Sequence, residues 1–235
     1  MHQIWEDLLF AHYEVDADRL RSVVPSQLPL DLFEGKAYIA VVPFRMRGIR
    51  PRYFPAVPWL SAFAELNVRT YVQLDGRPGV YFFSLDAANP VGVWLGYRWF
   101  HLPYRHARMQ CEAMGPDEND GIRYYSHRTH RGAPAADFVG DYGPTGPVYA
   151  AQPGSLEHWL TERYCLYAID PRGRVHRGEI HHAPWPLQPA RAQISVNTMS
   201  AAYNLAEQDL PGNASGPLLH FARSIDVVVW PPTVL

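Results

Sequence analysis

A strictly alternating stretch followed by a tight-turn dipeptide constrains the fold of this 235-residue chain more than any other feature. Leu66, Val68, Thr70, Val72 and Leu74 occupy alternate positions and are apolar except for the threonine, and Asp75-Gly76 then precedes a second, mainly apolar run at residues 80–85. Successive side chains of a strand point to opposite faces, and Asp-Gly is a favoured two-residue hairpin turn. The pattern therefore predicts a β-hairpin.

One face of the first predicted strand carries a group of polar side chains. Glu65, Asn67 and Arg69 share this face with Tyr71 and Gln73. If the strand belongs to a closed sheet and this face lines its interior, a carboxylate, an amide and a guanidinium could orient a small polar ligand. The alternative is a solvated outer face, and alternation alone does not say which face is buried. The first three residues are candidates for a binding site.

Similar patterns predict further strands and a few short helices. A helix with an Asp16 N-cap is expected at residues 16–24, a hairpin at 28–47 and a helix at 89–100. Other strands are expected at residues 108–114, 122–131, 174–182, 190–196 and 218–230, with a helix at 155–163. We expect an α+β fold in a single domain, residues 1–235, with a large antiparallel sheet closed or nearly closed into a barrel and short flanking helices.

Charge and hydropathy exclude several classes of partner. The 21 basic and 23 acidic residues leave a net charge of -2, which predicts no attraction to nucleic acid or to an anionic membrane. A run of arginines at residues 45–52 is interpreted as a solvated edge. No apolar stretch approaches the ~18 residues of a membrane span, and residues 1–15 lack the pattern of a secretion signal. A cytoplasmic protein whose partner is a small molecule is expected, and the sequence leaves its oligomeric state open.

Motifs for nucleophilic hydrolysis and for phosphate binding are absent from the sequence. There is no Gly-x-Ser-x-Gly, no Gly-x-Gly-x-x-Gly and no Gly-Lys-Ser string. Ser155, Glu157 and His158 are close in sequence, but they are better interpreted as the start of a helix, with Ser155 as its N-cap. A catalytic triad is therefore not expected.

The eleven histidines do not form a metal-binding motif. His127 and His130 are an odd number of positions apart in a predicted strand, so they point to opposite faces. Glu179 and His181 share a face and could cooperate in acid–base chemistry or in ligand binding, although a hydrogen-bonded surface pair is the default interpretation. No metal site and no cofactor are expected.

Four separated strings resemble the YqjF-like family of uncharacterised bacterial proteins. They are FAELNVRTYV at residues 63–72, VYFFSLDA at 80–87, GSLEHWLTERY at 154–164 and IHHAPWPL at 180–187. The resemblance extends over nearly the whole chain. It implies an acetoacetate decarboxylase-like fold, an antiparallel β-barrel with helices around a central pocket, and it brings no family-wide reaction.

The more distant resemblance to acetoacetate decarboxylase implies the position of a site. At that position this chain lacks the lysine nucleophile of the enzyme. Glu65 matches a glutamate of that enzyme, and residues 97–105 match its helix end and the Phe-Pro-Lys-Lys turn that carries the Schiff-base lysine. Tyr104 and Arg105 stand where the lysines would be. Lys36 is the only lysine of the chain and belongs to an early turn, and arginine cannot replace a deprotonatable amine. Decarboxylation through an imine is therefore not expected.

The resemblance and the polar strand face together suggest a small keto acid or related carbonyl compound as the ligand. Glu65 would be the base, Tyr104 a general acid or hydrogen-bond donor, and Arg98 or Arg105 would hold a carboxylate. The complete candidate ligand-binding set is Asn67, Arg69, Arg98, Arg105, Glu179 and His181. Activity of the lyase, hydratase or isomerase type is one reading. A non-catalytic ligand-binding or sensor protein, and a protein-interaction module using exposed aromatic residues, are the alternatives.

Overall fold

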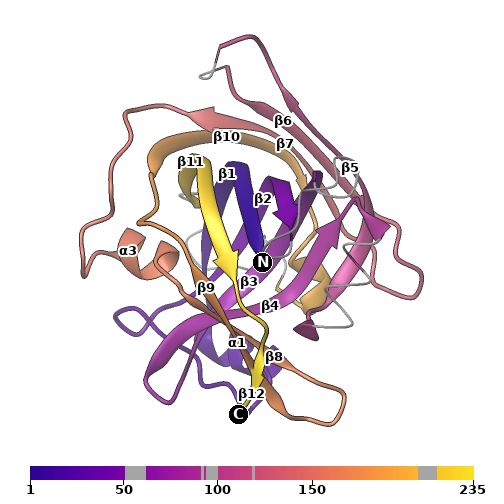
Figure 1. Ribbon diagram of the computed structural model, residues 1–235, viewed down its shortest axis with the longest axis vertical. Helices are drawn as coiled ribbons and strands as arrows, with labels where there is room; N and C mark the ends of the chain where they lie inside the picture. The colour runs from indigo at the N-terminus through magenta and orange to yellow at the C-terminus, as the bar shows by residue number, and fades with distance from the viewer. Residues whose placement is uncertain (51–61, 91–92, 94–99, 118–119, 206–215) are drawn as a thin grey trace.

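The computed structural model describes residues 1–50, 62–90, 93, 100–117, 120–205 and 216–235, and sheet dominates them (Figure 1). Its strands are β1 His2–Val15, β2 Ala37–Arg50, β3 Phe63–Leu74, β4 Arg77–Ala87, β5 Tyr104–Ala113, β6 Ile122–Arg128, β7 Asp137–Pro144, β8 Cys165–Ile169, β9 Val175–His181, β10 Gln188–Asn197, β11 Leu218–Val229 and β12 Thr233–Val234. The helices of the described residues are α1 Ala17–Val23, α3 Leu156–Thr161 and the short 3-10 helix η1 Ala201–Tyr203.

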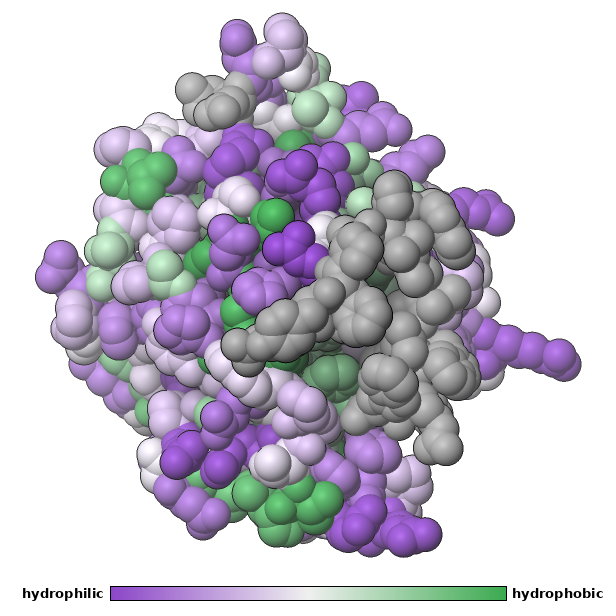
Figure 2. Space-filling model, in the orientation of Figure 1, coloured by the Kyte–Doolittle hydropathy of each residue, from purple (hydrophilic) through white to green (hydrophobic). Residues whose placement is uncertain are grey.

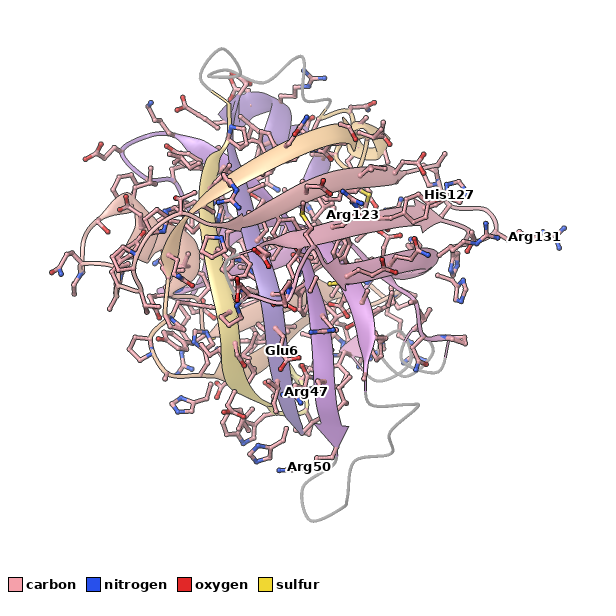
Figure 3. All side chains as sticks on the ribbon, turned by 90° about the horizontal axis from the view of Figure 1, so that it is seen from above. Glu6, Arg47, Arg50, Arg123, His127 and Arg131 are labelled. Atoms are coloured by element: carbon pink, nitrogen blue, oxygen red, sulfur yellow. The ribbon has the colours of Figure 1, made fainter. Side chains whose placement is uncertain are left out.

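The strands of the described residues form one sheet that closes on itself twice. Their order is β12-β9-β8-β4-β3-β2-β1-β11-β10-β7-β6-β5, with extra pairings of β9 with β11 and of β4 with β5. Two hydrogen-bonded rings therefore share one wall, made of β4, β3, β2, β1 and β11. Strands β8 and β9 complete the smaller ring, and β10, β7, β6 and β5 complete the larger ring. Figure 3 shows β5, β6, β7 and β10 running across β11, β1 and β2 as a second layer. The expected fold class is confirmed, with parallel pairing of β4 to β5 and to β8 within the mainly antiparallel sheet.

Each face of the shared wall contributes to a separate apolar core. Along β1, Leu9 and Ala11 belong to the first core, together with residues of β6 and β7. Leu8 and Phe10 point the other way and belong to the second core, together with Trp185 and residues of α3, β8 and β9. Because side chains alternate along a strand, a wall covered on both sides buries every position of its central strands.

The predicted β3–β4 hairpin is confirmed. Asp75 and Gly76 have φ of 51° and 72°, as a type I′ turn requires at both central positions. Both predicted helix caps are also present. The Asp16 carboxylate accepts a hydrogen bond from the Arg19 N–H at 2.8 Å, and the Ser155 hydroxyl accepts one from the His158 N–H at 3.2 Å.

The hairpin expected at residues 28–47 is wrong in its first half. Only Ala37–Arg50 is a strand, and the preceding segment makes isolated bridges, such as Leu30 to Val72. Pro29 has no N–H to donate to a ladder, which limits pairing there. Strand β6 ends at Arg128, so His130 lies outside it, contrary to the interpretation of this histidine as a strand residue.

Strands β1, β7, β8 and β12 were not predicted. In β1, three acidic residues break the apolar alternation, and Asp7 has a φ of 54° where the pairing with β2 changes register. The helix expected at residues 89–100 falls mostly outside the described residues. None of the described helices is long and apolar enough to cross a membrane. Figure 2 shows mostly hydrophilic side chains on one face of the molecule, with hydrophobic ones in small separate areas.

Candidate functional site

The polar face of β3 is buried. Glu65, Asn67 and Arg69 are 1%, 6% and 7% exposed. They lie opposite Phe44, Val42 and Ala40 of β2, which belong to the second core, and directly paired residues of antiparallel strands share a face. The solvated outer face, left open by the sequence, is therefore wrong for this strand.

Glu65 and Tyr104 are in contact. The Tyr104 hydroxyl donates a hydrogen bond to Oε2 of Glu65 at 3.0 Å. Burial raises the pKa of Glu65 to about 8, an effect that the hydrogen bond from Tyr104 opposes and the nearby Asp86 carboxylate adds to. Burial also raises the pKa of Tyr104 well above its usual value, and the neighbouring Glu65 raises it further. A carboxyl group with a pKa near the working pH can both release and accept a proton.

Neighbouring contacts fix the backbone that carries Glu65. The buried hydroxyl of Tyr124, on β6, donates to the backbone carbonyl of Glu65 at 2.7 Å. On the opposite face of the wall, Arg128 forms two hydrogen bonds of 2.7 Å to the carboxylate of Asp86, with both side chains fully buried. Arg128 also donates to the Ser84 hydroxyl at 2.9 Å. These contacts hold β6 against β3 and β4, so the position of Glu65 is rigid.

Arg69 lies further along the same face. Its Nε and Nη2 atoms have no hydrogen-bond partner, and its guanidinium carbon is 5.2 Å from the centre of the Phe10 ring. Asn67 lies between Glu65 and Arg69 on this face, and its Oδ1 is also unpaired. The face thus has an acid–base pair at one position and an unpaired cation at another.

Those of the remaining candidate residues that the structure describes do not join this group. Arg105 lies opposite Asp86 on the other face of the sheet, because it directly follows Tyr104 in β5. Glu179 is exposed and pairs with Arg77 at 3.2 Å, and His181 is exposed at the end of β9. Arg98 lies outside the described residues.

The surroundings of Lys36, the only lysine of the chain, do not favour formation of a Schiff base. Lys36 is exposed over 54% of its side chain and forms an ion pair with Glu14 at 2.8 Å. The hydrogen bond to Glu14 raises the pKa of Lys36, whereas an imine-forming lysine needs a lowered pKa. Within the described residues, no group of three or more His, Cys, Asp and Glu side chains could hold a metal ion.

Sequence reasoning missed several residues close to Arg69. His12 of β1 is buried near Arg69, whose charge lowers the pKa of this histidine. The ring of His220, on β11, lies 6.0 Å from that of His12, and the ring of Trp185, after β9, lies 4.9 Å from that of Phe10, which Arg69 contacts. Their isolated positions in the sequence give no signal of this proximity. To predict this proximity, the pairing of β1 with β2 and with β11 would have to be known, and β1 itself was not predicted.

Comparison with known proteins agrees with the fold. The model of the DUF2071 family, described as an uncharacterized conserved protein, matches residues 2–226. The uncharacterized protein YqjF of Bacillus subtilis (strain 168) is 46% identical over 231 residues, which are 98% of this chain and 90% of that protein. The expected resemblance to the YqjF-like family is thereby confirmed.

Solved structures with a similar fold are much more distant in sequence. The enduracididine biosynthesis enzyme MppR complexed with pyruvate has a TM-score of 0.65 at 14% identity, covering 99% of this chain and 89% of that one. An acetoacetate decarboxylase-like enzyme from Sphingomonas wittichii RW1 has a TM-score of 0.64 at 14% identity, covering 100% and 92%. The acetoacetate decarboxylase of Legionella pneumophila has a TM-score of 0.59 at 14% identity, covering 100% and 86%. At this low sequence identity, the similarity to these structures shows a common fold and nothing further.

Proposed function

Because the chain belongs to the DUF2071 family and has an acetoacetate decarboxylase-like fold, we propose that it binds a small polar or anionic carbonyl compound, such as a keto acid, beside Glu65 and Tyr104. The observation that carries this proposal is the buried hydrogen bond of 3.0 Å between these two side chains. A buried carboxyl group costs free energy that an apolar residue would not, and such groups cluster at functional sites.

Two observations favour an anionic carbonyl compound as the ligand. Arg69 is a buried cation on the same strand face, and no ion pair of the described residues involves it. The structural neighbour MppR is described in complex with pyruvate, which is a keto acid. That complex belongs to MppR, and we carry only the class of compound over to this chain.

The chemistry proposed for Glu65 and Tyr104 is proton transfer next to a carbonyl group. In its ionised form Glu65 would remove a proton from the carbon beside the carbonyl, and the Tyr104 hydroxyl would donate a hydrogen bond to the carbonyl oxygen as it gains charge. Return of the proton from Glu65 to a different atom of the enolate completes an isomerisation. In a hydratase or lyase type of reaction, the enolate instead expels a group such as hydroxide from the next carbon, and the proton held by Glu65 goes to that leaving group. No imine step is included, because the lone lysine, Lys36, is exposed and paired with Glu14.

We place this activity in the cytoplasm, with a small molecule as the partner and with neither nucleic acid nor membrane. The free cysteines Cys111 and Cys165 support a reducing compartment. The nearly balanced charge of the chain supports a partner other than a polyanion.

The alternative is a ligand-binding or sensor protein that holds the same compound without turnover. The two are distinguished by following exchange of the methyl protons of pyruvate with D₂O by NMR, with wild type and Glu65→Gln. An enzyme exchanges these protons at a rate that falls at least a hundredfold in the variant, while pyruvate binding is retained. Binding without exchange in wild type would indicate the sensor. The matched control is Glu179→Gln, an exposed glutamate outside the site.

A further inference from the structure

A second group of buried polar side chains lies near Arg69. In β1, His12 pairs with Ala40 of β2, which in turn pairs with Arg69 of β3, so the three side chains share one face. The ring of His220, on β11, is 6.0 Å from that of His12, and the ring of Tyr71 is 6.3 Å away. We call His12, Arg69, Tyr71 and His220 the Arg69 cluster.

The Arg69 cluster contains an unusual number of polar atoms without partners. Both ring nitrogens of His12, Nε and Nη2 of Arg69, the Tyr71 hydroxyl and Nδ1 of His220 are buried and make no hydrogen bond. The indole N–H of Trp185, whose ring packs on Phe10 beside His12, is also unpaired. Buried polar groups are nearly always hydrogen-bonded, so several unpaired ones close together indicate a missing polar partner.

The charges around the cluster indicate the sign of that partner. The nearby Arg163 is paired with Asp31 at 2.5 Å, and its guanidinium lies 5.1 Å from the Tyr71 ring. That pair leaves the Arg69 charge uncompensated. Burial, together with the neighbouring Arg69, lowers the pKa of His12 well below its usual value, so this histidine adds no charge at neutral pH. Burial also lowers the pKa of His220, against the effect of the Glu157 carboxylate. The charge within the cluster is therefore the positive charge of Arg69, which lies beside several hydrogen-bond donors.

We propose that the Arg69 cluster is an anion-binding site that receives the carboxylate of the ligand. Arg69 can donate from Nε and Nη2 to both oxygens of a carboxylate, and the His12 ring and the Tyr71 hydroxyl can donate further hydrogen bonds. This assignment rests on the proposed function for the identity of the ligand. Glu65 and Arg69 are four residues apart on one strand, so their Cα atoms are separated by about 13 Å and the two groups contact different parts of the compound.

The test compares a charged ligand with its neutral ester. Binding of pyruvate and of methyl pyruvate is measured by calorimetry with wild type, Arg69→Met and Arg69→Lys. We expect Arg69→Met to weaken pyruvate binding at least tenfold and Arg69→Lys to weaken it less, with methyl pyruvate unaffected by either change. Arg47→Met is the matched control, because Arg47 is an exposed arginine that pairs with Glu6 outside the cluster (Figure 3).

The outcomes separate this inference from the proposed function. If pyruvate binds and Tyr104→Phe weakens its binding, but neither Arg69 variant changes its affinity, the anion site is wrong and the proposed function stands. If pyruvate does not bind, but acetate raises the melting temperature of wild type and of Arg47→Met and not that of Arg69→Met, the anion site stands without the proposed function. If neither acetate nor pyruvate binds wild type, the anion site is overturned. Arg69→Lys serves as the decisive variant if Arg69→Met does not fold.

Discussion

Tyr104 reaches across a whole strand to donate its hydroxyl hydrogen to Glu65. Leu85 of β4 lies opposite Tyr104 of β5, while Glu65 of β3 lies opposite Ala87 of β4, so β4 runs between the two partners. This hydrogen bond of 3.0 Å passes over β4, on the face of the sheet that contributes to the second core. The pair therefore depends on the parallel pairing of β4 with β5, which is where the larger ring closes.

The first prediction concerns the pH dependence of folding. Burial raises the pKa of Glu65 from 4.5 to about 8, so between these values the unfolded state has lost a proton that the folded state retains. The Glu65 contribution to the free energy of unfolding is then fully present below about pH 4.5 and falls as the pH rises to about 8, by on the order of 5 kcal/mol.

Glu65→Gln removes this ionisation and keeps an oxygen that accepts from Tyr104. We expect the variant to gain stability relative to wild type as the pH rises from 5 to 8, with no further gain above pH 9. Urea unfolding of both proteins at several pH values measures this difference. A difference that stays constant with pH would contradict the raised pKa.

The second prediction concerns the buried ion pair of Asp86 and Arg128. Arg128→Met leaves the fully buried Asp86 carboxylate without its partner, and we expect a loss of about 3–5 kcal/mol in the free energy of unfolding. The same substitution should cost less in an Asp86→Asn background, where no charge is left unpaired. Denaturant unfolding of the four proteins in this cycle gives the coupling energy. Equal losses in both backgrounds would show that the pair is not coupled.

The third prediction tests the pairing of β4 with β8, which belongs to the smaller ring. A methyl group at Gly79 would lie 2.8 Å from the backbone oxygen of Cys165 and 2.7 Å from the Tyr167 ring. We expect Gly79→Ala to lower the free energy of unfolding by about 1–3 kcal/mol.

Gly178→Ala is the matched control, because its methyl group would meet only the flexible side chain of Leu166, at 2.9 Å. Its effect should be smaller. Thermal unfolding of both variants measures the contrast, and a Gly79→Ala protein as stable as wild type would be inconsistent with this close approach of β4 and β8.

Local features of the fold were predictable from the sequence, whereas those set by burial were not. The Asp75-Gly76 turn and the Ser155 cap follow from the chemistry of a few adjacent residues. The shared face of Glu65 and Arg69 follows from alternation, but its burial depends on the second core, which is assembled from distant strands. Arg105 shows a limit of the resemblance, because alternation alone would have separated it from Tyr104.

The proximity of His12 and His220 could not be predicted from the sequence, for a different reason. These residues are more than two hundred positions apart, and they meet only because β1 pairs with β11. The exposure of Glu179 and His181 agrees with the default interpretation of these two residues as a surface pair. Glu179 and His181 do share a face, as predicted, but that face is covered by solvent and not by the second core.

The most direct test of the central claim is the melting temperature of the protein with a panel of keto acids, simple carboxylates and sugars, measured for wild type, Tyr104→Phe and Tyr164→Phe. A ligand at 100 times its Kd stabilises by about 2.7 kcal/mol, which raises the melting temperature of a chain this long by several degrees. We predict that a keto acid produces this shift in wild type and in the Tyr164→Phe control, and that Tyr104→Phe reduces it. No shift with any compound, or a shift that Tyr104→Phe leaves unchanged, would contradict a ligand site at Glu65 and Tyr104.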